Sequence, residues 1–403
     1  MHSNTVDKTQ TCINRKTNMP MKKNNVKNTL QIHSQAKIEF YEKYLKRYLR
    51  ILCLAKSIKH INIYDVFCGM GIYDDGGKGS PIVTFDAVKD LVLDEKFIKT
   101  NTQISLIVND KEQLKIEQVK QFIDPQNNNF CNVKYYNYDI EQMFNIVEQE
   151  VLNTASDTRN LIFIDPYGYK DIKKETLYQL MLNGKTEIIL FLPVSHMHRF
   201  TQKAIQDEET AQYDPLRKFI NSFFDSNHKI IKEHLPIMEY IQFITTALTY
   251  NRFYTTSYYI ERDATNYFAL FFMSSHIFGF EKILEVKWQL DEEAGRGFKI
   301  QPLQKGLFDD FFVKEAKEKN ETKLESILFK LLAEPKTNKQ IYEETLKHEF
   351  LPTHTTKIFE KWQLNNPKFK VYDIKTGNEA RKKSFYISWT NYKEDKVQFV
   401  MGK

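Results

Sequence analysis

The sequence predicts an α/β fold built around a doubly wound, mostly parallel sheet. Three observations support this class. An apolar strand at Ile61–Val66 runs into a loop with five glycines between residues 69 and 79. Short apolar runs then alternate with helical periodicity as far as residue 192. These runs end beside acidic residues, glycine or proline, at the carboxyl ends of strands, where such sheets bind ligands.

The elements are expected in the following order. Apolar and tyrosine residues recur at helical spacing over 32–59, before the first strand. After the glycine loop, Ser80 is the expected N-cap of a helix and Pro81 its first residue. The other parallel strands are expected at 103–108, 133–138, 161–164 and 187–192, and the helices between them at 111–123, 140–152 and 172–182. A helical insertion is expected at about 196–251, followed by two strands and a helix at 252–260, 267–274 and 280–289.

Composition and charge indicate the cellular setting. Residues 1–28 are rich in Asn, Lys and Thr and are expected to form a disordered basic arm. No apolar run approaches the roughly 18–20 residues that span a bilayer, and no secretory signal is visible. The four cysteines form no C-x-x-C pair. We therefore expect a protein of the reducing cytoplasm, without a membrane segment or a metal site.

The last part of the chain is expected to form a second domain, 323–403, after a charged linker at 309–322. Three short helices and two strands (370–373 and 384–389, joined by a basic hairpin) have the order of a winged helix-turn-helix. Residues 314–403 hold 19 Lys and Arg against 13 Asp and Glu, which is the whole formal surplus of +6. This charge fits a nucleic-acid-binding domain, with a solvated or protein-binding surface as the alternative. The candidates for phosphate contact are Lys357, Lys361, Lys382 and Lys383.

The glycine loop predicts a cofactor without phosphate. Residues 65–71, DVFCGMG, have the form D-x-F-x-G-x-G, in which glycines let a cofactor approach the backbone and the Asp can bind an ammonium group. The P-loop pattern is absent, and Asp74 takes the place of the third glycine of a dinucleotide fingerprint. S-adenosylmethionine (SAM) is therefore favoured, with a plain strand–helix turn as the alternative. Its expected contacts in this loop are Asp65, Phe67, Gly69 and Gly71.

Two further carboxylates follow strands of the same sheet. Asp110 comes after the second strand and is placed to hold the ribose hydroxyls, with Asn109 and Glu112 as alternatives. Asp139 comes after the third strand and is placed to accept a hydrogen bond from the adenine amino group. Carboxyl ends of parallel strands lie at one edge of the sheet, so these residues are expected to line the same site. Ordinary loop carboxylates are the alternative.

Residues 165–169, DPYGY, follow the fourth strand and are the expected catalytic residues. Asp165 and the Pro166 carbonyl would accept hydrogen bonds from an exocyclic amine, which frees the nitrogen lone pair for attack on a methyl group. Tyr167 or Tyr169 would stack on the base. The turn resembles the D-P-P-Y/F of amino-methyltransferases without the second proline, and the D-P-Y-G of tRNA guanine-N2 dimethyltransferases, so the target base stays open. A structural Asp-Pro turn is the alternative. Candidates for contact with substrate phosphate or backbone are His196, His198 and Arg199.

These motifs resemble those of a known family, the three-Cys-motif partner proteins (TcmP). The resemblance runs from about Ile32 to the C-terminus and rests on several stretches. They are FCGMGIY at 67–73, DG at 75–76, GSP at 79–81, FIDPYG at 163–168, VKW at 286–288 and GRGF at 295–298. Family members usually carry Phe where Tyr167 stands. The resemblance implies a bacterial, SAM-methyltransferase-like protein that works with a three-cysteine-motif protein encoded nearby, which looks like a radical-SAM type protein.

Together these observations predict a Rossmann-like, class I methyltransferase domain at 29–308 and a winged-helix domain behind it. The expected activity is SAM-dependent methylation of an exocyclic amine of a nucleic-acid base. The alternative, from another class, is a non-catalytic nucleic-acid-binding or adaptor protein that keeps the methyltransferase fold. Binding of SAM discriminates between the two.

Overall fold

The computed structural model of the protein describes residues 29–94, 101–126, 129–207, 209–263, 265–292, 295–299 and 309–402. The predicted basic arm at 1–28 lies outside them. The larger sheet consists of β1 (His60–Asp65), β2 (Gln103–Asn109), β3 (Asn132–Tyr136), β4 (Thr158–Ile164), β5 (Thr186–Leu192), β6 (Tyr254–Asp263), β7 (Asn266–Ser274) and β8 (Gly297–Phe298). The smaller sheet consists of β9 (Lys336–Thr337), β10 (Phe369–Asp373) and β11 (Val397–Met401).

The helices alternate with the strands of the larger sheet and then dominate the rest of the chain. They are α1 (Ile32–Leu54), α2 (Ser80–Leu93), α3 (Gln113–Ile123), α4 (Ile140–Leu152), α5 (Lys174–Met181), α6 (Val194–Gln206), α7 (Asp214–Phe223), α8 (Lys229–Lys232), α9 (Ile237–Ala247), α10 (Ile277–Leu290), α11 (Asp309–Leu331), α12 (Asn338–Lys347) and α13 (Pro352–Asn365). The N-cap of α2 is Gly79, one residue earlier than the expected Ser80. Ser80 is therefore the first helical residue and Pro81 the second.

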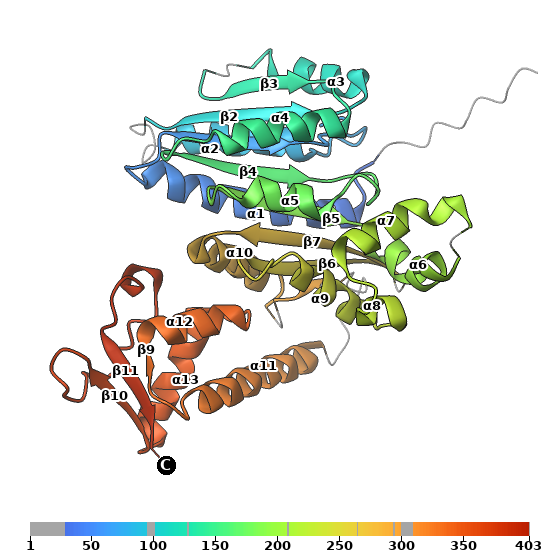
Figure 1. Ribbon diagram of the computed structural model, residues 1–403. Helices are drawn as coiled ribbons and strands as arrows, with labels where there is room; N and C mark the ends of the chain where they lie inside the picture. Colours follow the sequence, from blue (N-terminus) through green and yellow to red (C-terminus); the bar gives the residue numbers. More distant parts are fainter. Residues whose placement is uncertain are drawn as a thin grey trace, which may run out of the picture.

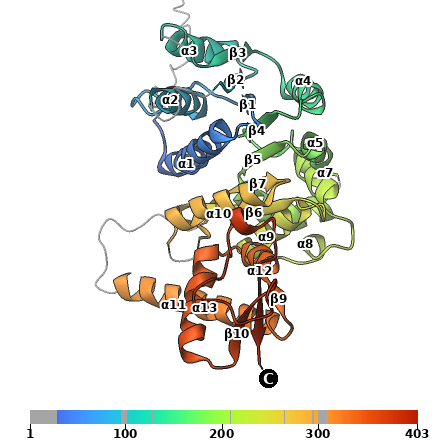
Figure 2. The ribbon, with the colours of Figure 1, turned by 90° about the vertical axis from the view of Figure 1, so that its left-hand side faces the viewer.

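The larger sheet has the strand order β3-β2-β1-β4-β5-β7-β6-β8. Strands β1 to β5 run parallel, and β7 is antiparallel to both β5 and β6. Figures 1 and 2 show α1, α2 and α10 on one face of the sheet and α4 and α5 on the other. The predicted α/β class with a mostly parallel sheet is confirmed.

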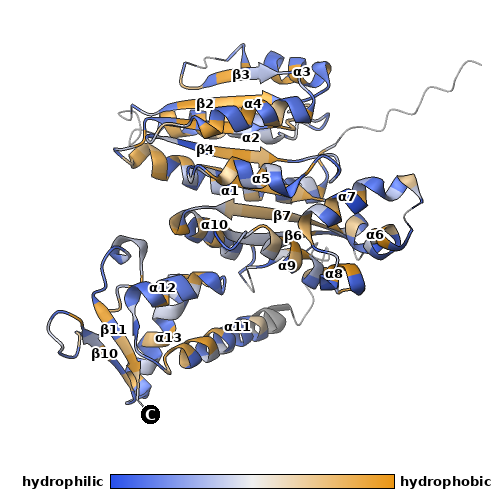
Figure 3. Cartoon of the chain, in the orientation of Figure 1, coloured by the Kyte–Doolittle hydropathy of each residue, from blue (hydrophilic) through white to orange (hydrophobic). Residues whose placement is uncertain are grey.

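Both faces of this sheet are covered, so its strands are apolar on both sides. In β4, Leu161 and Phe163 belong to the core that contains α1 and α2, whereas Ile162 and Ile164 belong to the core on the opposite face. Figure 3 shows mainly hydrophobic strands flanked by helices that carry both hydrophobic and hydrophilic residues. Tyr41 of α1 is fully buried against Phe163, with ring centroids 4.4 Å apart. The tyrosine pattern of α1 is therefore part of the core.

The helical segment between β5 and β6 lies beside the carboxyl ends of the parallel strands. Figure 1 shows α6, α7 and α8 grouped at the end of the sheet toward which β4 points. Two His-ring contacts help to build this segment, because His198 packs on Tyr240 and His228 packs on Phe243. None of the helices in the described part of the chain is both long and apolar enough to cross a membrane.

The C-terminal unit has the order α11, β9, α12, α13, β10, β11, with an antiparallel sheet ordered β10-β11-β9. Two expectations differ from this arrangement. The segment 309–322, expected to be a linker, is the first part of α11, which is one helix of 23 residues. The strand expected at 384–389 is absent, and the strand that pairs with β10 is β11 instead. Lys383 and Tyr386 have positive φ of 63° and 53°, and a strand cannot continue through such residues.

The C-terminal unit is docked on α10 by a buried polar cluster. Lys287 of α10 is 1% exposed and donates hydrogen bonds to Thr256 of β6 and to Glu349, which precedes α13. The indole Nε1 of Trp288 donates to the Glu349 carbonyl oxygen at 2.8 Å. Tyr342 of α12 donates to the Glu281 carboxylate. Because buried charges are stable only when paired, these contacts fix the unit against the larger sheet.

Candidate functional site

Asp65 ends β1 and is the electrostatic centre of the site. Its side chain is completely buried, and neither carboxylate oxygen has a hydrogen-bond partner among the described residues. The Asp65 pKa is raised to about 7, mainly by burial and to a smaller extent by the carboxylates of Asp165 and Asp110, while the nearby Ser80 hydroxyl and the charge of Lys37 act in the opposite direction. A buried carboxylate without a partner is costly and calls for an explanation. Its position beside the glycine loop suggests a ligand that supplies the missing donors.

The two glycines of the predicted motif have different roles. Gly69 has φ of +62°, and a Cβ placed there would meet nothing within 4 Å, so this turn faces open space. Gly71 has φ of +75°, and a Cβ there would lie 2.9 Å from the Val119 side chain. Gly71 therefore permits packing of the loop on α3, whereas Gly69 leaves room for a ligand. Phe67 is partly buried and packs on the core of the α4 face.

Asp110 lies next to this loop, as the sequence suggested. Its carboxylate is 1% exposed and accepts hydrogen bonds from the backbone N–H of Gly69 at 3.3 Å and of Glu112 at 2.9 Å. The hydroxyl of Tyr167 donates to the same carboxylate at 3.4 Å, and Lys115 Nζ lies 3.7 Å from it. The structure thus brings Asp65, Gly69 and Asp110 to one edge of the sheet.

Lys115 and Tyr167 form a pair above Asp110. The Lys115 ammonium donates to the Tyr167 hydroxyl and lies 4.4 Å from the centre of its ring. Tyr167 is 67% exposed and turns toward Asp110 instead of lying over Asp165. Lys115 was not among the predicted site residues, since a lysine at the start of a helix gives no sequence signal.

Asn109 and Glu112, the alternatives to Asp110 for the ribose contact, form other interactions. Asn109 holds the neighbouring strand ends together: its amide nitrogen donates to the carbonyl oxygens of Val66 and Tyr138, both at 3.2 Å, and its oxygen accepts from Tyr138 N–H at 2.9 Å. The Glu112 carboxylate pairs with Lys115 at 2.7 Å. Asp139 is exposed and caps α4 by accepting from the N–H of Gln142 at 2.9 Å. One carboxylate oxygen of Asp139 is therefore occupied by capping α4, and the contact of Asp139 with adenine stays a prediction.

Asp165 directly follows β4 and forms an ion pair with Lys37 of α1. The Lys37 side chain is 10% exposed and that of Asp165 is 22% exposed. The Lys37 ammonium also lies 4.6 Å from the ring centre of Phe191. Pro166, next to Asp165, is buried. Lys37 was missed by the sequence analysis because one lysine in a lysine-rich helix does not stand out, and only the fold carries it to the end of β4.

The residues expected to contact a substrate phosphate are held by their own neighbours. The Tyr169 hydroxyl lies 3.0 Å from His196 Nδ1. His198 Nε2 forms a hydrogen bond with the Leu235 carbonyl oxygen, and burial lowers the His198 pKa. Arg199 donates to the side-chain oxygen of Asn266, the first residue of β7. These contacts fasten α6 to the sheet, and Tyr169 and His196 remain beside the site.

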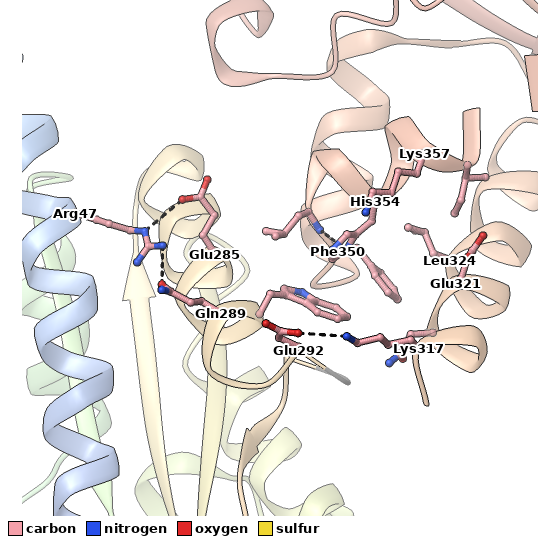
Figure 4. Close-up of a pocket in the computed structure, with 14 residues that line it drawn as sticks. Arg47, Glu285, Gln289, Glu292, Lys317, Glu321, Leu324, Phe350, His354 and Lys357 are labelled. Carbon is pink, nitrogen blue, oxygen red and sulfur yellow. Dashed lines mark hydrogen bonds and ion pairs between the residues drawn. The ribbon is translucent and has the colours of Figure 1, made fainter. Parts of the chain in front are cut away.

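The four lysines of the predicted nucleic-acid surface have different surroundings. Lys357 lines a cavity of about 640 Å³ between α10, α11 and α13, where Figure 4 shows it with His354 and Phe350. Lys361 pairs with Glu325 at 3.4 Å, and Lys383 pairs with Glu360 at 3.5 Å. Lys382 is exposed. The first half of α13 therefore faces the larger domain, which a helix that enters a nucleic-acid groove cannot do at the same time.

No family model matches the chain, and no curated protein matches its sequence. Among solved structures, an O-methyltransferase from Bacillus cereus in complex with SAH matches with TM-score 0.30 and 12% identity over 60% of this chain and 87% of that one. Trm1 from Pyrococcus horikoshii with S-adenosyl-L-methionine matches with TM-score 0.32 and 10% identity over 71% and 72%.

WbdD matches with TM-score 0.30 and 10% identity over 60% of this chain, and the match spans 40% of the WbdD chain. Identities of 10–12% and TM-scores of 0.30–0.32 carry no information about the chemistry of the site. The site itself has an unpartnered buried carboxylate, a glycine turn open to a ligand and a Lys–Asp pair at the carboxyl edge of a mostly parallel sheet.

Proposed function

We propose that this protein is a SAM-dependent methyltransferase that modifies an exocyclic amine of a nucleic-acid base. The observation that carries the proposal is Asp65, which is buried without a partner at the carboxyl end of β1. A ligand with an ammonium group would supply the missing hydrogen bonds and the compensating charge. The methionine part of SAM has such a group and no phosphate.

The surrounding residues fit the rest of this cofactor. The space beside Gly69 would take the part next to the ammonium group. The Asp110 carboxylate would hold the ribose hydroxyls, for which the contacts from Tyr167 and Lys115 would have to be released. The second oxygen of Asp139 would accept from the adenine amine. When bound, SAM supplies a methyl group on a positively charged sulfur.

The chain's contribution to transfer would come from Asp165. Its carboxylate would accept a hydrogen bond from the amine that receives the methyl group, together with the Pro166 carbonyl oxygen, and would orient it. Tyr169 lies on the same edge and remains a candidate ring for the base. The antiparallel pair β6 and β7 after five parallel strands supports the proposal, because class I methyltransferase sheets usually end in this way.

We also propose that the C-terminal unit is a winged helix that contacts nucleic acid, and that the protein works with a partner. Its order of helices and strands supports a winged helix. Its basic charge supports contact with nucleic acid. The family resemblance supports a bacterial protein, which we place in the cytoplasm. The resemblance to the three-Cys-motif partner proteins is the support for a partner of that kind. Lys382 is the strongest of the four lysine candidates, because it is exposed and Lys357 faces the cavity.

Calorimetry with SAM tests the proposal. We expect wild-type protein to bind SAM and Asp65→Ala to lose binding, whereas Asp165→Ala should keep binding and lose methyl transfer. Mass spectrometry of nucleosides from RNA and DNA of cells with and without the gene would identify the methylated base. Absence of SAM binding in the wild type, with Asp65→Ala unchanged, would overturn the proposal.

A second function from another class is a non-catalytic adaptor or nucleic-acid-binding protein. One observation favours it: the Asp110 carboxylate is already saturated by two backbone N–H groups, Tyr167 and Lys115. If these contacts persist in solution, the ribose has no place there. SAM binding by the wild-type protein would exclude a non-catalytic protein whose ribose site is blocked by these contacts.

A further inference from the structure

A group of side chains from three elements lies beside Asp165 and has no role so far. Figure 1 shows that α1 begins at the end of the sheet where β4 and β5 finish. The first turns of α1 carry His33 and Lys37, and β7 contributes Phe268 next to Phe191 of β5. The Lys37–Asp165 ion pair joins this group to the proposed methyl-transfer site.

Three rings of this group form a continuous stack. His33 and Phe268 are parallel within 2°, with centroids 4.8 Å apart, and Phe268 and Phe191 are parallel within 14° at 5.2 Å. Phe191 is buried, whereas His33 and Phe268 are only partly buried. Burial and the charges of Arg262 and Lys37 lower the His33 pKa. Phe268 lies between the other two rings, so the partly exposed end of the stack is the neutral His33 ring, which suits a flat ring as ligand.

The polar edge of the group offers donors and acceptors side by side. Lys37 has three N–H donors, of which one goes to Asp165, and the Asp165 carboxylate accepts at two oxygens. Adenine, cytosine and guanine each carry an amine donor beside an acceptor atom on one edge, which such a pair can bind. Uracil and thymine lack the amine; their donor is the ring N3–H, flanked by two carbonyl oxygens, one of which would lie against the Asp165 carboxylate and be repelled by it. The amine of a protein lysine has no acceptor, and its charge would be repelled by the Lys37 ammonium.

We propose that His33, Lys37, Asp165 and Phe268 form the subsite for the methyl acceptor, and that this acceptor is an amine-bearing nucleobase. The base would stack on His33, which Phe268 supports from behind, and place its amine on Asp165 and its acceptor atom on Lys37. This inference rests on the proposed function and specifies its substrate. It also replaces Tyr167 as the stacking ring, since Tyr167 is engaged with Lys115 and Asp110.

Arg262 extends the subsite outward. It is exposed, it lies near enough to His33 to lower the pKa of that ring, and its closest carboxylate in the described ion pairs is that of Asp263 at 4.0 Å. A nucleobase in a strand carries phosphates on both sides, and a guanidinium at the rim can bind one of them. A free nucleobase would not use this contact.

Equilibrium binding to fluorescent single-stranded 10-mers of dA, dC and dT tests the inference, with S-adenosylhomocysteine present so that no transfer occurs. We expect the wild type to bind dA or dC strands at least about tenfold more tightly than dT strands. Lys37→Met should reduce this preference to less than about twofold, because it removes the donor and keeps the length of the side chain. Lys43→Met, on the same helix, is the matched control and should keep the preference.

A second variant protects the test from effects on folding. Phe268→Leu should weaken binding of dA and dC strands about tenfold, because it removes the ring that holds His33 in its stacking position. Lys37→Arg should retain a preference for dA or dC over dT. Equal binding of all three strands by the wild type would overturn the inference, as would an unchanged preference in Lys37→Met together with unchanged affinity in Phe268→Leu. Methylation found only on ribose hydroxyls would also overturn it. If the wild type binds SAM and methylates a base amine while the binding results fail, the subsite is wrong and the proposed function stands, whereas methylation only on ribose hydroxyls overturns both.

Discussion

Replacing Asp65 by Asn should stabilise the protein without ligand. Asn has nearly the same shape as Asp, but it carries no charge into the buried site. In the folded protein burial holds the Asp65 pKa at about 7, against an ordinary value of 3.8. Between these two values the folded state keeps a proton that the unfolded state releases. The free energy of unfolding of the wild type therefore falls as the pH rises through this window, and it levels off above pH 7.

The size of this effect follows from the pKa difference. Each pKa unit corresponds to about 1.4 kcal/mol, so a difference of roughly 3 units costs the wild type about 4 kcal/mol above pH 7. Between pH 5 and pH 8 the advantage of Asp65→Asn should grow by about 3 kcal/mol. The amide of the Asn variant has no hydrogen-bond partner, which costs about 1–3 kcal/mol of stability. This cost is the same at pH 5 and at pH 8, so it does not change the expected growth of the difference between them.

Chemical denaturation of both proteins at pH 5 and pH 8 measures this difference. Asp139→Asn is a matched control, because Asp139 is exposed at the N-cap of α4 and Asn caps a helix about as well as Asp. The control should show less than about a third of the pH dependence. The reasoning is refuted if the stability difference between wild type and Asp65→Asn is the same at both pH values, or if it shrinks toward pH 8.

Three other predictions test separate parts of the structure. Gly71→Ala should cost about 2–4 kcal/mol because of its positive φ and the clash with Val119, and Gly69→Ala only about 1–2 kcal/mol; equal losses in thermal denaturation would contradict the roles given to the two glycines. Glu349→Ala should cost about 2–3 kcal/mol and expose α12 to hydrogen exchange, because it leaves a buried ammonium on α10 unpaired; unchanged exchange would show that the polar cluster does not fix the unit. Phe359→Ala, in the core of the C-terminal unit, should cost about 3–5 kcal/mol and split the calorimetric transition in two; a single transition at lower temperature would instead indicate one cooperative unit.

The fold of the larger domain was predictable because its strands carry a strong local signal. Each is a short apolar run closed by Asp, Gly or Pro, and the helices between them have clear apolar periodicity. The C-terminal unit was harder. Phe385 and Ile387 alternate like strand residues and are buried, but the positive φ of Tyr386 bends the chain between them. Alternation of apolar and polar residues indicates which side chains are buried. The path of the backbone depends on tertiary contacts, which cannot be read from the sequence.

The candidate site was predictable at the positions where a strand ends and not elsewhere. Asp65 is the last residue of its strand, and Asp110 and Asp165 directly follow theirs, so parallel topology alone brings them to one edge. Lys37 and His33 reach the same edge from a helix that precedes the sheet, and their position depends on how α1 packs across it. Periodicity predicts that α1 has a buried face, but it does not predict which end of the sheet each turn of that face meets.

The distance between the two predicted contacts with nucleic acid limits what the substrate can be. The site lies at the carboxyl ends of the parallel strands, whereas Figure 1 shows the C-terminal unit toward their opposite ends. A strand of seven residues such as β5 spans about 23 Å. A nucleic acid that touches both regions at once must therefore cover the length of the sheet, which a single nucleotide cannot do. If methylation of a short single strand proceeds as well as that of a long folded RNA, the C-terminal unit has another role, and its docking on α10 serves the stability of the chain.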